Sequence, residues 1–129
     1  MARQAGGGRD RGSFSLELAV LAPALLLVIS FIISVGRVTE GRALAEGAAR
    51  DAARAATINH NGDAEAAARV AYDAAVKGHD CSNLVITPLV PVPGGSVSAT
   101  ASCRVTTLWG RQTITRTSVS AVDIYRGTD

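Results

Sequence analysis

The pattern of hydrophobic and polar positions changes twice along the chain. A continuous block without a formally charged residue runs from Leu18 to Val35, an Ala-rich stretch follows from Arg37 to Thr57, and strand-like texture begins near Leu84. The charge-free block has 18 residues, or about 27 Å as a helix. Since the hydrocarbon core of a bilayer is about 30 Å thick, this block predicts a membrane-spanning helix.

The Ala-rich stretch is expected to continue that helix. No glycine-rich break separates the two segments, and Glu46 and Arg50 have the favourable i,i+4 spacing. We therefore expect one helix from about Phe14 to Thr57, which leaves the membrane as a stalk. Its small side chains allow close packing, either against like helices in a filament or complex or against the protein's own sheet and second helix.

A second, shorter helix is expected after a turn at residues 59–62. Asp63 can cap this helix, which would extend from about Ala64 to Lys77 and end at Gly78. Its apolar positions are mostly small, so the helix should lie on the domain rather than form a core alone. These positions include Ala67, Val70, Ala71, Ala74 and Val76.

The C-terminal part predicts strands of a half-buried sheet. A short strand at residues 84–87 runs into three prolines, which favours an edge strand and an irregular loop. Residues 96–109 alternate between apolar and polar, and Gly110-Arg111-Gln112 can close a hairpin. A third strand would follow from Thr113 to Tyr125, with a bulge near Arg116. The expected inward face of the middle strand is Val97, Ala99, Ala101, Cys103, Val105 and Trp109.

Together these elements predict an α+β fold. A long N-terminal membrane-spanning helix continues as a stalk, and a second short helix and a small antiparallel sheet of about three strands follow. Four regions result: a leader at residues 1–12, a transmembrane segment at 13–36, Ala-rich extracytoplasmic helices at 37–78 and a small β domain at 79–129.

The exported part is short of large side chains. Apart from two Phe in or beside the apolar block, the chain has one Trp and two Tyr, so the core is thin and needs a staple, an anchor or a partner. Cys81 and Cys103 are the only cysteines, and such a pair in an exported domain is typical of a disulfide. The bridge would contribute roughly 3 kcal/mol. Two buried free thiols are the alternative.

The distribution of charge indicates the orientation of the helix. The first twelve residues carry three Arg and one Asp, which accounts for the whole net charge of +2. No basic stripe remains for a phosphate backbone, so nucleic-acid binding is not expected. Because cytoplasmic flanks are rich in Arg and Lys, the N-terminus should stay in the cytoplasm and the chain after Arg37 should be exported.

A removable secretory signal is the competing interpretation of the apolar block. Small-x-small sites exist at Ser34-Val35-Gly36 and Ala43-Leu44-Ala45. The block is longer than the usual apolar region of a signal peptide, and charged residues precede the second site. Both features favour a span that is retained.

No catalytic, metal or cofactor site can be singled out in the sequence. The two histidines, His60 and His79, are 19 positions apart, without a ligand pair at metal-site spacing. There is no G-x-S-x-G elbow, and no glycine-rich phosphate loop follows a strand. We therefore expect neither an enzyme nor a cofactor.

Glu17 is a carboxylate at the edge of the apolar span, where a charge is costly. A cut after Gly12 would make Glu17 the fifth residue and give Ser13 a new amino terminus. A positive amine, from the same chain or a neighbouring one, compensates a buried carboxylate. The plainer alternative is that Glu17 is the last interfacial residue before the span.

Arg11-Gly12, four residues, Glu17-Leu18 and then Pro23 inside an apolar run resemble the leader of type IV pilin-like proteins. The chain is most similar to the TadE-like proteins of tight-adherence pilus systems, and residues 46–56 resemble the Ala/Arg-rich segment of that family. The resemblance covers about residues 11–57. It implies a pilin-like fold and cleavage between Gly12 and Ser13 by a prepilin peptidase. Ser13 departs from the Phe that major pilins typically have at this position.

The resemblance also implies a function. The chain would be a minor pilin or pseudopilin-like component of a tight-adherence pilus or its assembly machine, anchored in the cell membrane with its C-terminal domain extracytoplasmic or in an extracellular pilus. Its partners would be the lipid bilayer, other pilin-like subunits, pilus assembly proteins and the prepilin peptidase. Two alternatives stay open: an uncleaved single-pass accessory protein of a secretion system, and a secreted small binding domain.

Overall fold

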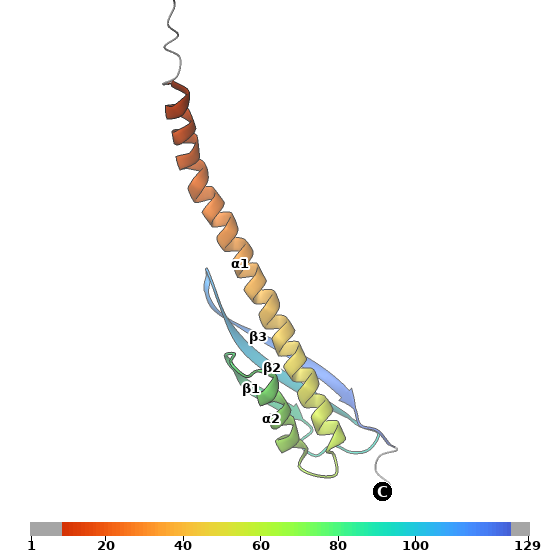
Figure 1. Ribbon diagram of the computed structural model, residues 1–129. Helices are drawn as coiled ribbons and strands as arrows, with labels where there is room; N and C mark the ends of the chain where they lie inside the picture. The colour runs from red at the N-terminus through yellow and green to blue at the C-terminus, as the bar shows by residue number, and fades with distance from the viewer. Residues whose placement is uncertain (1–8, 125–129) are drawn as a thin grey trace, which may run out of the picture.

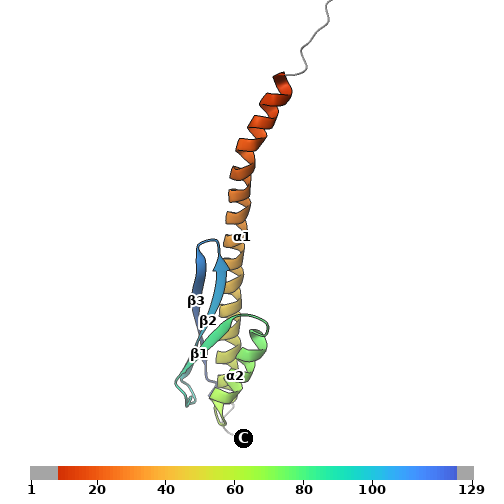
Figure 2. The same cartoon turned by 90° about the vertical axis from the view of Figure 1, so that its left-hand side faces the viewer.

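The computed structural model describes residues 9–124, with side chains from residue 14 onward. Two helices, α1 (Arg9–Ile58) and α2 (Ala64–Ala75), precede three strands, β1 (Cys81–Thr87), β2 (Ser96–Thr107) and β3 (Gly110–Ala121). The predicted α+β fold is therefore confirmed. Both helices lie on one face of the sheet, and the N-terminal half of α1 extends far beyond the other elements (Figures 1 and 2).

The long helix α1 is continuous from the apolar block into the Ala-rich stretch, as the sequence predicted. Pro23 lies inside it without ending it, and membrane helices tolerate such prolines. The predicted ion pair on the stalk is present, with Arg50 Nη2 3.0 Å from Glu46 Oε1. Both side chains are more than half exposed, so this pair stabilises the helix only slightly.

The second helix begins at the predicted residue. The Asp63 side chain caps it by accepting a hydrogen bond from the Ala66 backbone N–H at 3.0 Å, and Gly78, at φ +83°, lies in the turn that follows. Among its apolar positions, Val70 is 71% exposed. The buried residues of α2 are Ala64, Ala68 and Tyr72, followed by Val76 at the C-cap.

The three strands form an antiparallel sheet in the order β1-β2-β3, so β1 is an edge strand as predicted. The pairing of β2 with β3 is uninterrupted from Ser96↔Ala121 to Thr107↔Gly110. The predicted bulge near Arg116 is therefore wrong, and the register shift lies between Cys81 and Asn83 of β1 instead.

The predicted hairpin turn is also displaced. Leu108 and Trp109 form a two-residue turn, and Gly110 already pairs with Thr107 as the first residue of β3. Gly110 has φ +110°, a conformation that glycine adopts readily and other residues rarely. Trp109, which the alternation placed on the inward face of β2, is 77% exposed at the tip of the hairpin.

The core lies between the C-terminal half of α1, α2 and the inner face of the sheet. Its largest fully buried side chains are only Val97 and Cys103. Of the two partners considered for the Ala-rich surface, the structure shows the protein's own sheet and second helix. The buried alanines of α1 are Ala45, Ala48, Ala49, Ala52, Ala53 and Ala56.

Candidate membrane and assembly site

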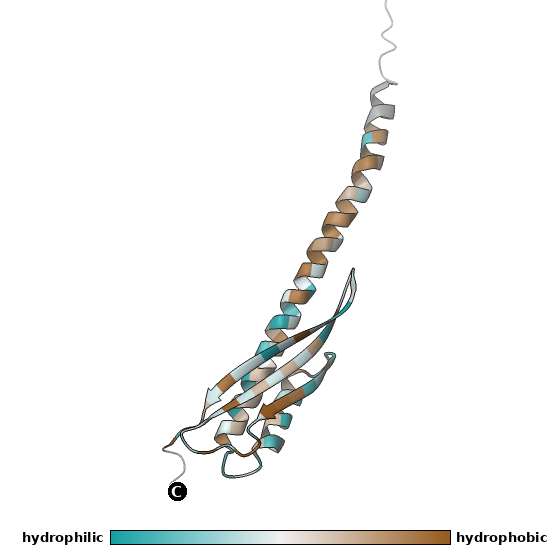
Figure 3. Cartoon of the chain, turned by 180° about the vertical axis from the view of Figure 1, so that it is seen from behind, coloured by the Kyte–Doolittle hydropathy of each residue, from teal (hydrophilic) through white to brown (hydrophobic). Residues whose placement is uncertain are grey.

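The N-terminal half of α1 presents apolar side chains to its surroundings on every side. No residue from Phe14 to Ile33 is buried, and Leu18, Leu27 and Phe31 are all more than half exposed. Within the described residues, one helix is long and apolar enough to cross a membrane, and it is this one. In Figure 3, most of the part of α1 that extends beyond the sheet has the colour of hydrophobic residues. A surface of this kind needs lipid or other protein to cover it.

Packing of α1 on the rest of the protein begins at Ser34, which is 6% exposed. The Ser34 hydroxyl donates to the Ser30 carbonyl at 2.9 Å and accepts the Leu108 backbone N–H at 3.3 Å. The segment Phe14–Ile33 before this point has 20 residues, or about 30 Å of helix. Its length therefore matches the hydrocarbon thickness of a bilayer.

Two turns further along, Gly41 lets α1 approach the hairpin closely. A Cβ at this position would lie 2.5 Å from Val105 Cγ1 and 3.1 Å from Ile114 Cδ1. Gly36 and Gly47, also on α1, have nothing within 4 Å of the corresponding position. Of these three glycines, Gly41 is the one at which the absence of a side chain permits contact with the sheet.

The tip of the β2–β3 hairpin lies beside α1 at the end of its apolar half (Figures 1 and 2). Leu108 and Trp109 are 56% and 77% exposed. Between the tip and the helix is an open groove of about 430 Å³, lined by Leu27, Val28, Phe31, Leu108 and Trp109. The tip therefore adds its own apolar side chains to the apolar surface of α1.

The structure places the predicted processing and assembly residues at the start of α1. Glu17 is exposed near the beginning of the apolar segment. Gly12 and Ser13 lie in the first turns of α1, but their side chains are outside the described residues. The pairing of Glu17 with an amine at Ser13, and the cleavage after Gly12, stay predictions.

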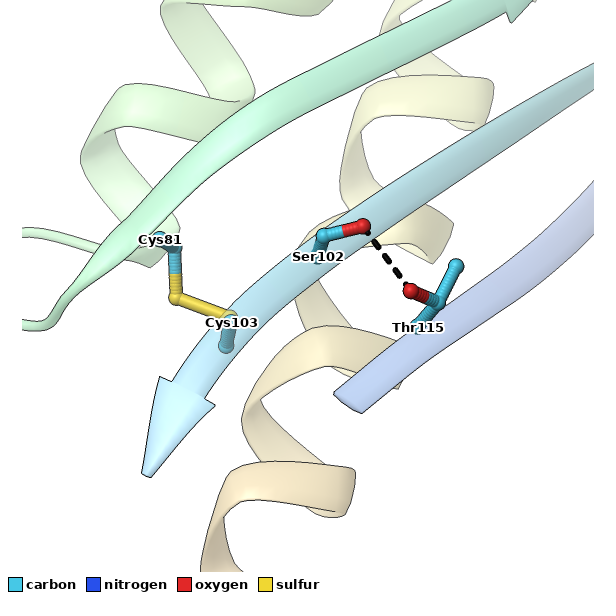
Figure 4. Close-up of a disulfide and its surroundings, with 4 residues drawn as sticks. All are labelled: Cys81, Ser102, Cys103 and Thr115. Carbon is cyan, nitrogen blue, oxygen red and sulfur yellow. Dashed lines mark hydrogen bonds between the residues drawn. A yellow bond between two sulfur atoms is a disulfide. The ribbon is translucent and has the colours of Figure 1, made fainter. Parts of the chain in front are cut away.

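The predicted disulfide is present and joins Cys81 of β1 to Cys103 of β2 (Figure 4). Cys103 is fully buried and Cys81 packs against the edge of the core. The bridge closes a loop with a sequence separation of 22 residues. Because this loop lowers the conformational entropy of the unfolded chain, it raises the free energy of unfolding by roughly 3 kcal/mol. It staples a core that consists mostly of small side chains.

The titratable groups show no arrangement for metal binding within the part of the chain that the structure describes. No three His, Cys, Asp or Glu side chains lie close enough together to hold an ion. His60 is buried and its Nδ1 is 2.9 Å from the Thr57 carbonyl, to which it can donate. Burial, with the Asp73 carboxylate as a smaller cause, raises the pKa of Tyr72 above its ordinary value.

A free apolar segment of membrane length, followed without a break by a packed Ala-rich stalk, is the arrangement that the hydropathy pattern predicted. Residues 12–54 match the family model of TadE-like proteins. This match confirms the resemblance over that segment, which overlaps the one helix among the described residues that is long and apolar enough to cross a membrane. It ends within α1, before α2 and the sheet. No curated protein and no solved structure matches the chain.

Sequence reasoning missed two features next to this TadE-like segment. One is the contact at Gly41, and the other is the apolar hairpin tip formed by Leu108 and Trp109. The dipeptide Trp109-Gly110 was a usable signal for the tip, because a glycine directly after an apolar pair favours a turn there.

Proposed function

We propose that this chain is a minor pilin or pseudopilin-like structural subunit of a tight-adherence pilus or of its assembly machine. The observation that carries the proposal is the division of α1 into two halves. Residues 14–33 are apolar and uncovered by the protein itself, whereas the Ala-rich half from residue 34 onward holds α2 and the sheet.

The apolar half suits two environments in turn. Before assembly it would lie in the bilayer, where about 20 apolar residues span the hydrocarbon core. After extraction the same surface would be buried against the helices of neighbouring subunits, since an all-round apolar helix is stable in water only when it is covered. The sheet and α2 would then form the outer surface of the assembly.

Glu17 is the residue through which subunits would recognise one another. Cleavage between Gly12 and Ser13 by a prepilin peptidase at the cytoplasmic face would leave a positive amine at Ser13. A carboxylate within an apolar helix bundle is costly unless it is paired. The amine of Ser13, from the same or a neighbouring subunit, would compensate it and set the register between helices.

The contacts of α1 argue against the secreted alternative. A cut after Ala45 would remove Gly41 and uncover Val105 and Ile114, which pack against it. A cut after Gly36 would remove the Ser34 hydroxyl that accepts the Leu108 N–H. A span that stays attached keeps both contacts, so the competing form is an uncleaved accessory protein with its helix still in the membrane.

The proposal predicts that Glu17→Ala blocks assembly and leaves membrane insertion intact, because loss of the charge favours the apolar environment but removes the pairing between subunits. The measurements are the amount of the chain in sheared pili and in carbonate-washed membranes of the native host. The N-terminal sequence of the wild-type chain in those membranes should begin at Ser13.

The matched control is Glu46→Ala, which removes a carboxylate from the exposed stalk of the same helix. This variant should assemble like the wild type, because an exposed ion pair contributes little. Normal assembly of Glu17→Ala would refute the pairing mechanism. A wild-type chain that keeps its leader would favour the uncleaved accessory protein.

A further inference from the structure

We propose that the tip of the β2–β3 hairpin is a lipid-binding site, in which Leu108 and Trp109 enter the extracytoplasmic interface of the bilayer that α1 crosses. The inference rests on the membrane-anchored state within the proposed function. It does not depend on whether the chain later enters a pilus.

The first argument is the level of the tip along α1. Its side chains share a groove with Leu27, Val28 and Phe31, all of which belong to the charge-free block. If the bilayer ended before Val28, the span from Leu18 would be only about 15 Å long, roughly half of the hydrocarbon thickness. A span of adequate length therefore brings Leu108 and Trp109 to the membrane surface or just below it.

The second argument is the chemistry of the tip. Trp is enriched at membrane–water interfaces, where its ring lies among apolar chains and its N–H remains near water. Leu108 and Trp109 are two adjacent large apolar side chains in a turn, a position that polar residues usually occupy. Their exposure would be unfavourable in water, and it becomes favourable when lipid covers them.

The third argument is that backbone groups of the tip are satisfied within the protein. The Leu108 N–H donates to the Ser34 hydroxyl at 3.3 Å, and the Trp109 N–H donates to the Thr107 hydroxyl at 3.3 Å. The Thr107 hydroxyl in turn donates to the Gly110 carbonyl at 3.0 Å. A turn in water needs no such partners, whereas a turn that enters a less polar layer does.

Basic residues flank the tip on the side of the folded domain. Arg37 lines the surface beside Leu108 and donates to the Thr106 carbonyl at 3.4 Å, and Arg42 lines the surface beside Trp109. Arg111 follows directly in β3. With the tip in the interface, these guanidinium groups would lie at the level of the lipid phosphates.

A second point of contact with lipid would restrict how the subunit sits in the membrane. A single helix can rotate about its axis and slide along it. An inserted tip on one side of α1 fixes both movements and holds the sheet at a set angle to the bilayer. Extraction of the subunit would then require the tip to leave the lipid together with the helix.

The test uses Trp109, the one Trp of the chain, as its own reporter. The full-length protein is reconstituted into phosphatidylcholine and phosphatidylglycerol vesicles whose acyl chains carry bromine at a shallow or a deep position. We expect blue-shifted Trp109 emission, strong quenching by shallow bromine, weaker quenching by deep bromine, and little quenching by aqueous iodide.

Variants separate insertion of the tip from general burial. Leu108→Asp should withdraw the tip, with a red shift of Trp109 emission and loss of bromine quenching, whereas Leu108→Ile should behave like the wild type. In a chain carrying Trp109→Phe and Val90→Trp, the reporter lies at the opposite end of the sheet, in the exposed loop after β1. Its emission should be quenched by iodide and not by bromine.

Each remaining outcome overturns the proposal in a recognisable way. A chain that floats with the vesicles but whose Trp109 is quenched only by iodide refutes lipid insertion and leaves the membrane anchor standing. A second outcome is a blue shift without bromine quenching. If this blue shift disappears when the protein is diluted in lipid, a second copy of the chain covers the tip. A chain that fails to float refutes the anchor as well.

Discussion

Gly41 sets the distance between α1 and the hairpin. Because a methyl group at this position would lie 2.5 Å from Val105 Cγ1, Gly41→Ala must move the Val105 side chain, the helix or the strand. Such overpacking costs about 1–3 kcal/mol, which exceeds the gain of about 0.5–1 kcal/mol from Ala in a helix. We expect the free energy of unfolding to fall by about 1 kcal/mol. Denaturant unfolding of the full chain in detergent micelles, followed by circular dichroism, measures it.

Gly47→Ala is the control for Gly41, because it makes the same substitution where nothing lies within 4 Å. Only the helix propensity changes there, so the free energy of unfolding should rise by about 0.5–1 kcal/mol. Equal changes in the free energy of unfolding of the two variants would show that the contact at Gly41 does not affect stability.

Tyr72 makes the stability of the folded domain sensitive to alkaline pH. Its pKa is raised above 10.0 by burial and by Asp73, so the folded state holds the phenolic proton more tightly than the unfolded state. The stabilisation is complete below pH 10 and is lost as the pH rises through the higher pKa of the folded state. Tyr72→Phe has no phenolic proton at this position, so its stability should fall less at alkaline pH than that of the wild type.

The same variant should not weaken the protein at neutral pH, because the Tyr72 hydroxyl is buried without a protein partner among the described residues. Unfolding midpoints of the wild type and of Tyr72→Phe, measured at neutral pH and above pH 10, give both comparisons. An alkaline decline that is identical in the two proteins would assign it to other groups.

At the scale of elements, strong local signals were sufficient to predict most of the fold. The charge-free block and the Ala-rich stretch predicted α1 almost to its last residue, since Ile58 ends what was expected to end at Thr57. Asp63 predicted the start of α2 through the capping that the structure shows. The cysteine pair predicted its disulfide, because a small core with few large side chains needs one.

The predictions that failed concern surfaces with weak contrast between inside and outside. Ile114 pairs with Cys103 on the inner face, whereas Val119 pairs with Ser98 on the outer face and is 66% exposed. An edge strand tolerates an outward Val at little cost, so the change of phase in β3 did not require a bulge.

The hairpin tip was misassigned because its apolar residues lie outside the core. Trp109 continues the alternation of β2 and was therefore placed inside, but β2 ends at Thr107 and the ring lies at the tip. Patterns of hydrophobicity indicate that a residue avoids water, and they do not distinguish a protein core from a lipid layer.

As a whole, the molecule joins a part that requires apolar surroundings to a part that holds a disulfide, a bond typical of oxidising compartments. Residues 14–33 are the first part, and the disulfide-bonded sheet belongs to the second. The charges at the two ends of the apolar segment decide which side faces the cytoplasm. The leader carries three Arg, but Arg37 and Arg42 follow the segment closely, so orientation rests on a small excess of positive charge.

Replacing the three leader arginines, Arg3, Arg9 and Arg11, by Ser should therefore invert a fraction of the chains. Inverted chains would hold Cys81 and Cys103 in the reducing cytoplasm, where the thiols stay free. A maleimide reagent should label the wild type only after reduction, and it should label part of the variant without reduction.

As a control of equal charge, Arg54, Arg69 and Arg116 are replaced by Ser. Since they lie far from the span, labelling should stay as in the wild type. Free thiols in the unreduced wild type would place the sheet in the cytoplasm and refute the orientation.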